Sequence, residues 1–470
     1  METEAIKIKT PIARVKRVFF DNVSGRVYHS ITGVPRQLEI NRETIDMFIR
    51  LGYVSGDETL FKGIQCLPGG ATIQISGGEW TIVKEFRYGD LINKDIYRDI
   101  PEEELIKRGK QKWLGVIDKL YRRGSEIVVP ISGGLDSRAI LAGLLECTDA
   151  ASIQTYTFGL LGTYDYEIGN RVAAVAGTRH TRFDLSRFPF DDEILTETCR
   201  QTDGNVNIFL PAFSLPIIKS YSESAEFWSG FLGGELAGAH IPQEINHDSA
   251  KATRAYYLRE ARKISNHLVP AKELGGWMCF INVASRFSTY ITLDEQLDFY
   301  LRQERCIANQ LFFNNSSYIA PFIKNEWMEF MLSVPFALRI KKCIYSHLLQ
   351  LSFPSLFSLP VQETCGLPLD ASKLVVTLKK IKNRALARLD RRYVNPGTNY
   401  ICFNRELRSD TLLKRQVEAS VADLKIRQIV DNQFVDSLWK EHQAGEQNNS
   451  LILMNLASLE KIIKTFNVKC

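Results

Sequence analysis

The chain has 470 residues, of which 45% are hydrophobic and 24% are charged, and its formal net charge at pH 7 is +5. This length allows two or three domains with a large buried core, the composition is ordinary for a soluble globular protein, and the charge is too small to indicate nucleic-acid binding. The nine cysteines include no CxxC pair, which argues against both a disulfide framework and a zinc site.

Residues 15–90 contain short strand-like runs, such as residues 26–30 and 71–75, separated by glycine and proline, and they predict a small β-rich domain over residues 1–100. The first 30 residues hold no secretory apolar region, and no apolar run reaches the ~20 residues that span a bilayer, so we expect a cytoplasmic protein. Residues 101–122 then predict a linker helix whose first turn is acidic and whose end is basic, charges that complement the helix dipole.

An apolar run at residues 128–131 predicts a strand that leads through a glycine loop directly into a helix. The loop and the helix start consist of Ser132, Gly133, Gly134, Leu135, Asp136 and Ser137. Such a loop points N–H groups into a concavity at the positive end of a helix, where glycine lets phosphate oxygens approach closely. The serines add hydroxyl donors, and Asp136 adds a carboxylate that can hold Mg²⁺. The loop lacks the lysine of a P-loop, so we expect a polyphosphate site of another kind.

The sequence Ser-Gly-Gly-x-Asp-Ser at residues 132–137 resembles the pyrophosphate loop of the ATP pyrophosphatases, which include asparagine, β-lactam and GMP synthetases. The resemblance implies that the loop holds the β- and γ-phosphates of ATP while a substrate oxygen attacks the α-phosphorus, so that AMP is transferred and pyrophosphate leaves. ATP and Mg²⁺ are therefore the expected cofactors. A plain Gly-Gly turn between a strand and a helix is the alternative.

Residues 152–159 predict a second strand, and apolar residues at helical spacing follow between residues 168 and 175. This alternation predicts an α/β fold with a doubly wound parallel sheet over residues 101–370, whose ligands lie at the carboxyl ends of the strands. The last four residues of the second strand resemble the adenine-side segment of the asparagine synthetases, which implies that Phe158 and Gly159 contact ATP. An ordinary βα unit explains them equally well.

Residues 227–240 predict a strand followed by a glycine-rich loop, and they resemble the family's second nucleotide motif, Ser-Gly-x-Gly-x-Asp-Glu. The resemblance places Gly230 among the ATP-binding residues. The aspartate that binds Mg²⁺ in the family is replaced here by Gly234, and Glu235 follows directly. We therefore expect Glu235 to join Asp136 on the metal and to act in catalysis, with a solvated loop carboxylate as the alternative.

Two further positions bear on catalysis. Asp203, in the run Gln-Thr-Asp-Gly-Asn, is a second candidate catalytic residue. Residues 362–366 align with the family's Arg-x-Lys-x-Gly, whose lysine faces the acyl-adenylate, and this lysine is replaced by Thr364. The loss implies a different electrostatic partner, a different reaction or no reaction, because a cation near the developing charge stabilises the transition state. Lys341 and Lys342 are nearby candidates for that cation.

Residues 52–70 resemble the late part of the glutaminase domain of asparagine synthetases. A working glutaminase of that family uses a cysteine at the mature N-terminus as nucleophile, with its own amino group as base. Here the chain begins with Met1, and its first cysteine is Cys66. The resemblance therefore implies that residues 1–100 are a shortened, catalytically silent remnant and that glutamine is not the nitrogen source.

Residues 371–470 predict a helical C-terminal extension. Within it, residues 373–392 form a basic helix with an apolar stripe made by Leu374, Leu378, Ile381, Ala385 and Leu389. The first interpretation is a core stripe below a solvated basic face. The second is a surface for anionic lipid or a phosphorylated substrate, and thus a peripheral membrane contact.

Together these features predict an ATP-dependent amide ligase or amidotransferase that activates a carboxylate as an acyl-adenylate. Ammonia or an amine would then displace AMP. The resemblance to divergent members favours a carboxylate of a small molecule, a glycan or a peptide, in polysaccharide or peptide natural-product biosynthesis. Two alternatives remain: a cyclase of the lasso-peptide or β-lactam type, and a nucleotide-binding scaffold without catalysis. We expect no nucleic-acid partner, and the oligomeric state stays open.

Overall fold

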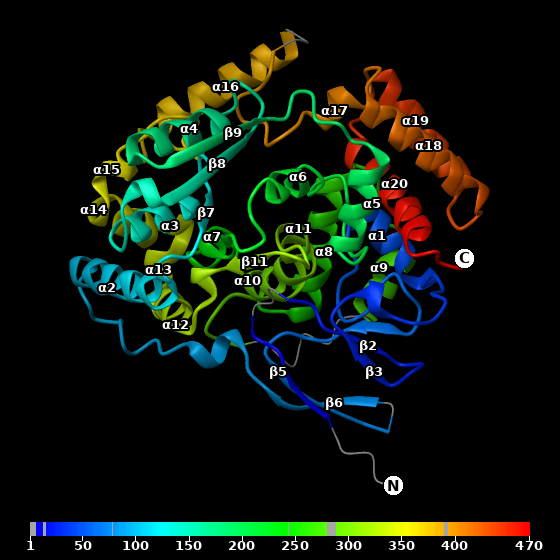
Figure 1. Cartoon of the computed structure of the whole chain (residues 1–470), viewed down its shortest axis with the longest axis horizontal. Coiled ribbons are helices and arrows are strands. Elements are labelled where there is room, and N and C mark those ends of the chain that lie inside the picture. The colour runs from blue at the N-terminus through cyan, green and yellow to red at the C-terminus, as the bar shows by residue number, and fades with distance from the viewer. Residues whose placement is uncertain (1–5, 13–15, 78, 243, 280–287, 390–392) are drawn as a thin grey trace.

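The computed structural model describes residues 6–12, 16–77, 79–242, 244–279, 288–389 and 393–470 (Figure 1). At its centre lies a sheet of five strands with the order β11-β10-β7-β8-β9, and every pair of neighbours is parallel. The strands are β7 (Ile127–Pro130), β8 (Ile153–Gly159), β9 (Arg179–Asp184), β10 (Glu226–Trp228) and β11 (Ser317–Ile319). The predicted α/β class and the parallel sheet are confirmed.

The strand order reverses beside β7. The chain moves outward from β7 to β8 and β9, and it then returns to the other side of β7 to form β10 and β11. Residues Ile127, Val128 and Val129 of β7 are at most 2% exposed, so this strand is covered on both faces, as expected for a parallel sheet. A reversal of this kind opens a crevice at the carboxyl ends of the strands.

Helices make the crossovers between the strands. Helix α3 (Asp136–Leu145) links β7 to β8, and α4 (Tyr164–Ala176) links β8 to β9 and ends at Gly177, whose φ is +76°. The longer connections contain α5 (Asp192–Gln201), α6 (Ser214–Lys219), α7 (Gly233–Leu236), α8 (Ser249–Ile264), α9 (Ala271–Cys279), α10 (Leu293–Leu297), a π-helix (Asp298–Ile307) and α11 (Ala308–Leu311). The predicted helix at residues 168–175 is thus part of α4.

The N-terminal part contains two antiparallel sheets of three strands. One has the order β1-β5-β6 and the other β3-β2-β4. Their strands are β1 (Ile6–Lys9), β2 (Phe19–Asp21), β3 (Arg26–Tyr28), β4 (Ile64–Cys66), β5 (Ala71–Ser76) and β6 (Glu79–Glu85), and α1 (Ile45–Leu51) follows β3. Strand β5 buries Ala71, Ile73 and Ile75 in alternation, so one face of its sheet packs on a small core.

Helix α2 (Glu102–Leu120) confirms the helix predicted over residues 101–122. Its buried side packs on α3, where Trp113 Nε1 donates a hydrogen bond to the Ala139 carbonyl oxygen (3.0 Å). This helix is therefore part of the body of the protein rather than a free linker.

The remaining helices continue the chain to its last residues. They are α12 (Asn325–Ser333), α13 (Phe336–Arg339), α14 (Cys343–Ser352), α15 (Pro354–Phe357), α16 (Lys373–Leu389), α17 (Phe403–Glu406), α18 (Leu412–Ile426), α19 (Asn432–Ala444) and α20 (Ser450–Thr465). The structure brings α20 back to the N-terminal part: thirteen of its sixteen residues are buried, and the Lys469 amide donates to the Leu38 carbonyl oxygen (2.8 Å). Within the described residues, no helix is both long and apolar enough to cross a membrane.

One hydrophobic core therefore joins parts of the chain that lie far apart in sequence. It includes Leu51 of α1, Val128 of β7 and Leu456 of α20. The boundaries predicted at residues 100 and 370 stay predictions.

The interpretation of the apolar stripe of α16 as a core stripe is wrong. Leu374, Leu378 and Ile381 are 72%, 58% and 57% exposed. The helix is instead held by its other side, where Asn383 is buried and donates through Nδ2 to the Tyr164 hydroxyl (2.9 Å). Arg391 and Arg392, which the sequence places at the end of the basic helix, lie outside the described residues.

Candidate functional site

The predicted phosphate loop lies at the carboxyl end of β7, next to the reversal of the strand order. The chain leaves β7 at Pro130, turns through residues 132–135 and begins α3 at Asp136. The Ser132 amide donates to Ser137 Oγ (3.2 Å), and the Gly134 amide donates to Ser132 Oγ (3.2 Å). The hydroxyls of both serines thus lie at the N-terminal end of α3, as the sequence motif predicts.

Gly133 is held from two sides. Its amide donates to Asp165 Oδ1 (3.0 Å), and its carbonyl oxygen accepts from the Gln362 amide (2.9 Å). A Cβ at this position would lie 3.1 Å from the Tyr164 carbonyl oxygen, which explains the glycine. Burial raises the pKa of Asp165 above its usual range. An anion that binds the Gly133 amide would have to displace the Asp165 carboxyl, which is poorly solvated.

Asp136 connects three elements of the site. The Tyr345 hydroxyl of α14 donates to its Oδ1 (2.9 Å), and the Gly234 amide of α7 donates to its Oδ2 (3.1 Å). Burial raises the pKa of Asp136 to about 7, although the positive charge of Lys342 and the Tyr345 bond act in the opposite direction. The negative charge of Glu235 raises it further. This carboxylate is partly buried and its ionised form is destabilised, so a nearby cation would stabilise it.

The second glycine-rich motif packs directly on Asp136. A Cβ added at Gly230 would lie 3.0 Å from Asp136 Cβ, and one added at Gly233 would lie 2.6 Å from Asp136 Oδ1. Leu232, between them, adopts a left-handed conformation with φ +66°. The structure thus brings together the two motifs that the sequence singled out, and it explains why glycine occupies positions 230 and 233.

Gly233→Ala is expected to weaken ATP binding at least tenfold, because its methyl group must displace the Asp136 carboxylate. Gly234→Ala is the matched control: its Cβ would lie 3.4 Å from Asp136 Oδ2, an ordinary contact, and its φ is not positive. Titration of fluorescent ATP into both variants measures the effect. Equal affinities would contradict the assigned packing.

Glu235 lies in α7 and faces a second polar group. Gln303 Nε2 donates to Glu235 Oε1 (3.4 Å) and to Asp298 Oδ2 (3.0 Å), and His240 Nδ1 lies 2.9 Å from Asp298 Oδ2. Burial raises the pKa of Glu235, and the hydrogen bond to Asp298 raises the pKa of His240. Glu235 is partly buried within this group, and its role on the metal stays a prediction. Sequence reasoning missed Asp298 and Gln303, which stand on the π-helix.

Of the two candidate cations, Lys342 is the one that faces the loop. Its side chain pairs with Glu363, and its charge lowers the pKa of Asp136. A Cβ at Gly234 would lie 3.8 Å from Lys342 Cδ. Lys341 is exposed, and both lysines adopt left-handed conformations, with φ +55° at Lys341 and +61° at Lys342. Thr364, in the position of the family's lysine, donates from Oγ1 to the Val361 carbonyl oxygen (3.2 Å).

The predicted adenine-side residues are packed against aromatic rings. Phe158 lies 4.8 Å from Phe213 and 5.2 Å from Tyr400, measured between ring centroids. Gly159 has a φ of +149°, and its added Cβ would lie 3.3 Å from Tyr166 Cβ. Tyr400 was not found by sequence reasoning, because it lies more than 200 residues further along the chain and no motif marks it.

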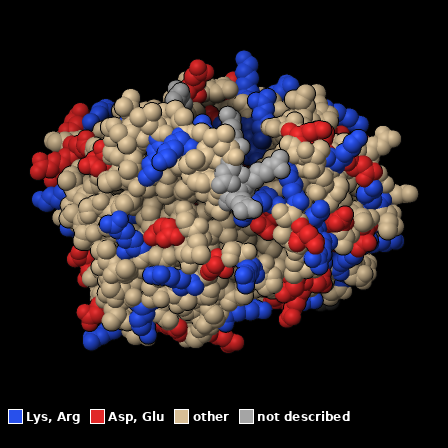
Figure 2. Space-filling model, turned by 90° about the horizontal axis from the view of Figure 1, so that it is seen from above, with Lys and Arg blue, Asp and Glu red and all other residues tan. Residues whose placement is uncertain are grey.

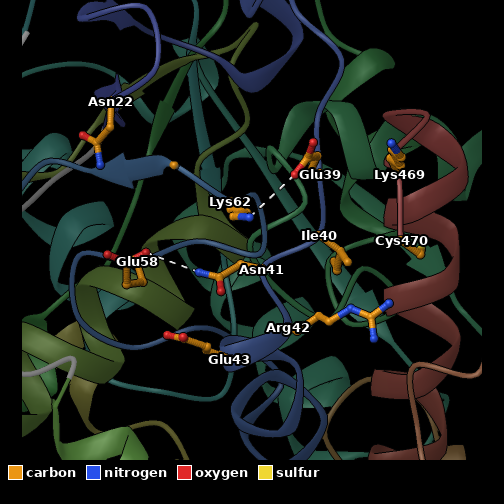
Figure 3. Close-up of a pocket in the computed structure, with 11 residues that line it drawn as sticks. Asn22, Glu39, Ile40, Asn41, Arg42, Glu43, Glu58, Lys62, Lys469 and Cys470 are labelled. Atoms are coloured by element: carbon orange, nitrogen blue, oxygen red, sulfur yellow. Dashed lines mark hydrogen bonds and ion pairs between the residues drawn. The ribbon is translucent and has the colours of Figure 1, made fainter.

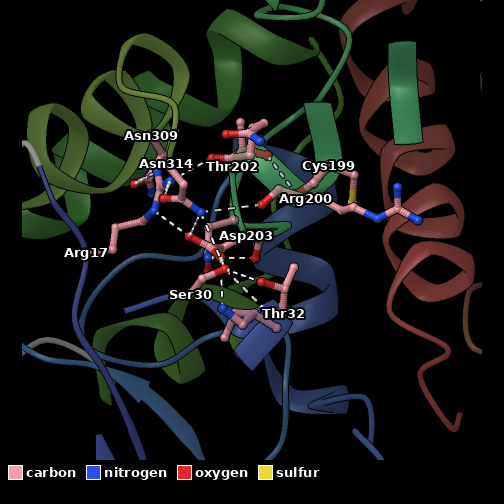
Figure 4. Close-up of polar contacts among 12 residues, drawn as sticks. Arg17, Ser30, Thr32, Cys199, Arg200, Thr202, Asp203, Asn309 and Asn314 are labelled. Carbon is pink, nitrogen blue, oxygen red and sulfur yellow. Dashed lines mark hydrogen bonds and ion pairs between the residues drawn. The ribbon is translucent and has the colours of Figure 1, made fainter. Parts of the chain in front are cut away.

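Asp203 lies in a buried hydrogen-bonded group (Figure 4). Its Oδ2 accepts from Arg17 Nε (2.8 Å) and Asn314 Nδ2 (3.0 Å), and its Oδ1 accepts from Ser30 Oγ (2.6 Å) and the Ile31 amide (2.8 Å). These four donors fill the carboxylate and tie the N-terminal part to the end of α5. The geometry supports a structural role for Asp203 and gives no support to the predicted catalytic one.

Arg17→Met is expected to lower the free energy of unfolding by about 3–5 kcal/mol, because it leaves the buried Asp203 carboxylate without its cation. The control is Arg415→Met, whose ion pair with Asp410 is 64% and 85% exposed and should contribute about 0.5 kcal/mol or less. Urea denaturation followed by fluorescence compares the two variants. A similar small change in both would show that the Arg17–Asp203 pair does not anchor the fold.

The donor set around Asp136 fits Mg²⁺ with phosphates as further ligands. The negative charge of Glu235 raises the pKa of Asp136, and Mg²⁺ commonly takes one or two carboxylates plus phosphate oxygens. In the part of the chain that the structure describes, no group of three or more His, Cys, Asp or Glu residues is arranged to hold a metal ion. Phosphates would therefore have to supply the remaining ligands.

A pocket of about 570 Å³ lies between the N-terminal part and the last residues, Lys469 and Cys470 (Figure 3). Lys62 Nζ lies 3.8 Å from Glu39 Oε2 there, and Asn41 Nδ2 donates to Glu58 Oε2 (3.3 Å). Cys66 does not line this pocket, and its side chain is 6% exposed. Met1, at the start of the chain, lies outside the described residues.

Comparison with known proteins points to the same segment of the chain. Residues 118–214 match the family model of asparagine synthase. A protein of Methanocaldococcus jannaschii, named Putative asparagine synthetase (glutamine-hydrolyzing) 2, is 23% identical over 137 residues, which cover 29% of this chain and 26% of that protein. The match thus spans about a quarter of the relative's length. The family match includes β7, β8, β9 and the loop at residues 132–135, so this segment of the chain is similar to asparagine synthase.

Proposed function

We propose that the protein is an ATP-dependent carbon–nitrogen ligase of the asparagine synthetase type. The observation that carries the proposal is that Asp136 packs against the loop at residues 230–234 and interacts with the charge of Lys342. The order of the five strands supports a doubly wound sheet of the ATP pyrophosphatase type, with the loop at its topological reversal. The family match over residues 118–214 supports the ligase class.

In the proposed reaction, a substrate carboxylate oxygen attacks the α-phosphorus of ATP, the bond to the bridging oxygen breaks, and pyrophosphate leaves. Ammonia or an amine then attacks the acyl carbon, loses a proton, and AMP leaves. The amides of Gly133 and Gly134 and the hydroxyls of Ser132 and Ser137 would hold the β- and γ-phosphates. Leu135 contributes backbone at the start of α3. Mg²⁺, when bound, neutralises phosphate charge, and Asp136 with Glu235 would hold it.

Lys342 would supply the cation that Thr364 cannot. It comes from a different part of the chain from the family's lysine, but its pairing with Glu363 places it beside residue 364. A cation fixed near the developing charge stabilises the transition state of adenylation. Gly234 and Thr364 favour the second candidate, a nucleotide-binding scaffold without catalysis, and Lys342 favours the enzyme.

The carboxylate is proposed to belong to a glycan, a peptide or another small molecule, and the nitrogen donor to be ammonia or an amine, in the cytoplasm. A cyclase, in which amine and carboxylate belong to one molecule, uses the same first step. ATP–pyrophosphate exchange with a panel of such carboxylates tests that step directly. We expect exchange that depends on both the carboxylate and Mg²⁺, and ATP binding without any exchange across the panel would favour the scaffold.

The N-terminal part is expected to release no glutamate from glutamine, because Cys66 is buried in β4 and has no N-terminal amine as a base. The measurement is glutamate release with the wild-type protein and with Cys66→Ala, each against a buffer control. Release by the wild type that Cys66→Ala abolishes would contradict the proposed absence of a glutaminase.

A further inference from the structure

Helix α16 exposes its apolar side and is held to the protein by its polar side. Leu374, Leu378 and Ile381 share an arc with Ala385 and Leu389 that spans about 80° of the helix surface. Leu389 is 84% exposed, and Val375, at the edge of the arc, is 47% exposed. A surface helix of a globular protein usually turns such a stripe toward the core.

The attachment of the helix lies on the opposite side. Asn383, on the far side from Ile381, donates to the Tyr164 hydroxyl and accepts from the Tyr393 hydroxyl (3.2 Å). Lys379 Nζ lies 5.6 Å above the Tyr164 ring. Figure 1 shows α16 on the outer edge of the molecule, beyond α4 and β9.

Basic residues flank the stripe on both sides. Lys373, Lys380 and Arg384 lie on one side and Lys382 lies on the other, and all four are exposed. Residues 373–389 contain six Lys or Arg and no Asp or Glu, a charge of +6 against +5 for the whole chain, so the rest of the chain sums to −1. Figure 2, which views the molecule from this upper side, shows Lys and Arg side chains beside uncharged surface, with Asp and Glu side chains elsewhere on the same face.

We propose that α16 docks the protein on an anionic lipid surface. The stripe needs an apolar phase, and the flanks need negative charge on both sides over the ~25 Å length of the helix. Acyl chains below a layer of anionic headgroups supply both at once. A second copy of this chain fits poorly, because two such helices would bring +6 against +6. The proposal does not depend on the reaction at the ATP site.

The test is flotation of the full-length protein with vesicles of phosphatidylcholine alone and with vesicles that contain 30% phosphatidylserine. We expect at least tenfold tighter binding to the anionic vesicles and a loss of this preference at high salt. Equal binding to both vesicles, or binding to neither, would overturn the proposal.

Two double variants separate the two contributions. Leu378→Asp with Ile381→Asp removes the apolar contact and should weaken binding at least tenfold, and Lys380→Glu with Arg384→Glu should do the same through charge. The matched control is Ile426→Asp with Lys440→Glu, two exposed positions outside α16, which should bind within twofold of the wild type. Unchanged binding of either α16 variant would contradict the proposal.

Light scattering tests whether a second copy of the chain, instead of lipid, covers the apolar stripe of α16. We expect the wild type and the Leu378→Asp, Ile381→Asp variant to have the same mass in solution. A wild-type dimer that this variant converts to a monomer would show that a second copy covers the stripe and would overturn the proposal. Circular dichroism of each variant establishes that it is folded, since all four substituted side chains on α16 are exposed.

Discussion

Asp136→Asn should lower carboxylate-dependent ATP–pyrophosphate exchange at least a thousandfold, by the loss of one negative charge at the phosphate and Mg²⁺ site. The variant keeps the volume of the side chain against Gly230 and Gly233. Tyr345→Phe is the control, because it removes a hydrogen bond to the same carboxylate (2.9 Å) and keeps the charge, so we expect less than a tenfold loss. Undiminished exchange in Asp136→Asn would contradict the assignment of the loop.

Asp136→Asn should raise the stability of the free protein, although it lowers the exchange rate. Burial raises the pKa of Asp136 from 3.8 to about 7, so between pH 4 and pH 7 the folded state keeps a proton that the unfolded state has lost. The contribution of this group to the free energy of unfolding therefore falls as the pH rises through that window. At pH 8, without Mg²⁺ or ATP, the free energy of unfolding of Asp136→Asn should exceed that of the wild type by up to about 4 kcal/mol. At about pH 3.5 the two free energies of unfolding should agree.

Urea denaturation across this pH range measures the difference. A wild-type stability that is no lower than that of the variant at pH 8 would show that the carboxylate is not buried at a cost. A buried charge that destabilises the free protein and is needed for activity is the pattern expected of a functional group rather than a structural one.

Lys342→Met should lower the exchange rate about a hundredfold or more, and Lys341→Met should change it less than threefold. The two lysines are adjacent and share a left-handed conformation, but only the side chain of Lys342 pairs with Glu363 and acts on Asp136. A fixed cation at a developing charge is typically worth a few kcal/mol, which corresponds to this loss.

The pH dependence gives a second readout. The charge of Lys342 lowers the pKa of Asp136, so its removal should raise that pKa and move the acidic limb of the exchange profile to higher pH. If Lys342 had a purely structural role, Lys342→Met would lower the exchange rate without moving the acidic limb of the pH profile. Equal rates in Lys342→Met and Lys341→Met would remove Lys342 from the site.

The sequence predicts those features that depend on local patterns. The strand, the loop and the helix start at residues 128–137 follow from a short apolar run, two glycines and a helical repeat, and the structure has all three. Their contacts with residues far along the chain could not be predicted in this way. Tyr345 reaches Asp136 across 209 positions, and neither its motif nor its spacing points to this contact.

The error at α16 has a different physical cause. Helical spacing identifies the residues that share a face, here Leu374, Leu378 and Ile381, but it does not state which face the rest of the protein covers. The attachment of Asn383 to Tyr164 decides that question. The four donors to the buried Asp203 carboxylate come from distant parts of the chain, so its sequence neighbours could not predict this anchoring contact.

The return of α20 to the N-terminal part constrains the order in which this protein can fold. Leu38 and Lys469 are joined by a backbone hydrogen bond across more than 400 positions, and α1 packs against a helix that leaves the ribosome last among those described. During synthesis, the apolar face of α1 must therefore stay exposed, or be bound by a chaperone, until α20 has been made. Closing so long a loop makes this contact a late step, and we expect truncation before residue 450 to yield aggregates rather than a smaller folded protein.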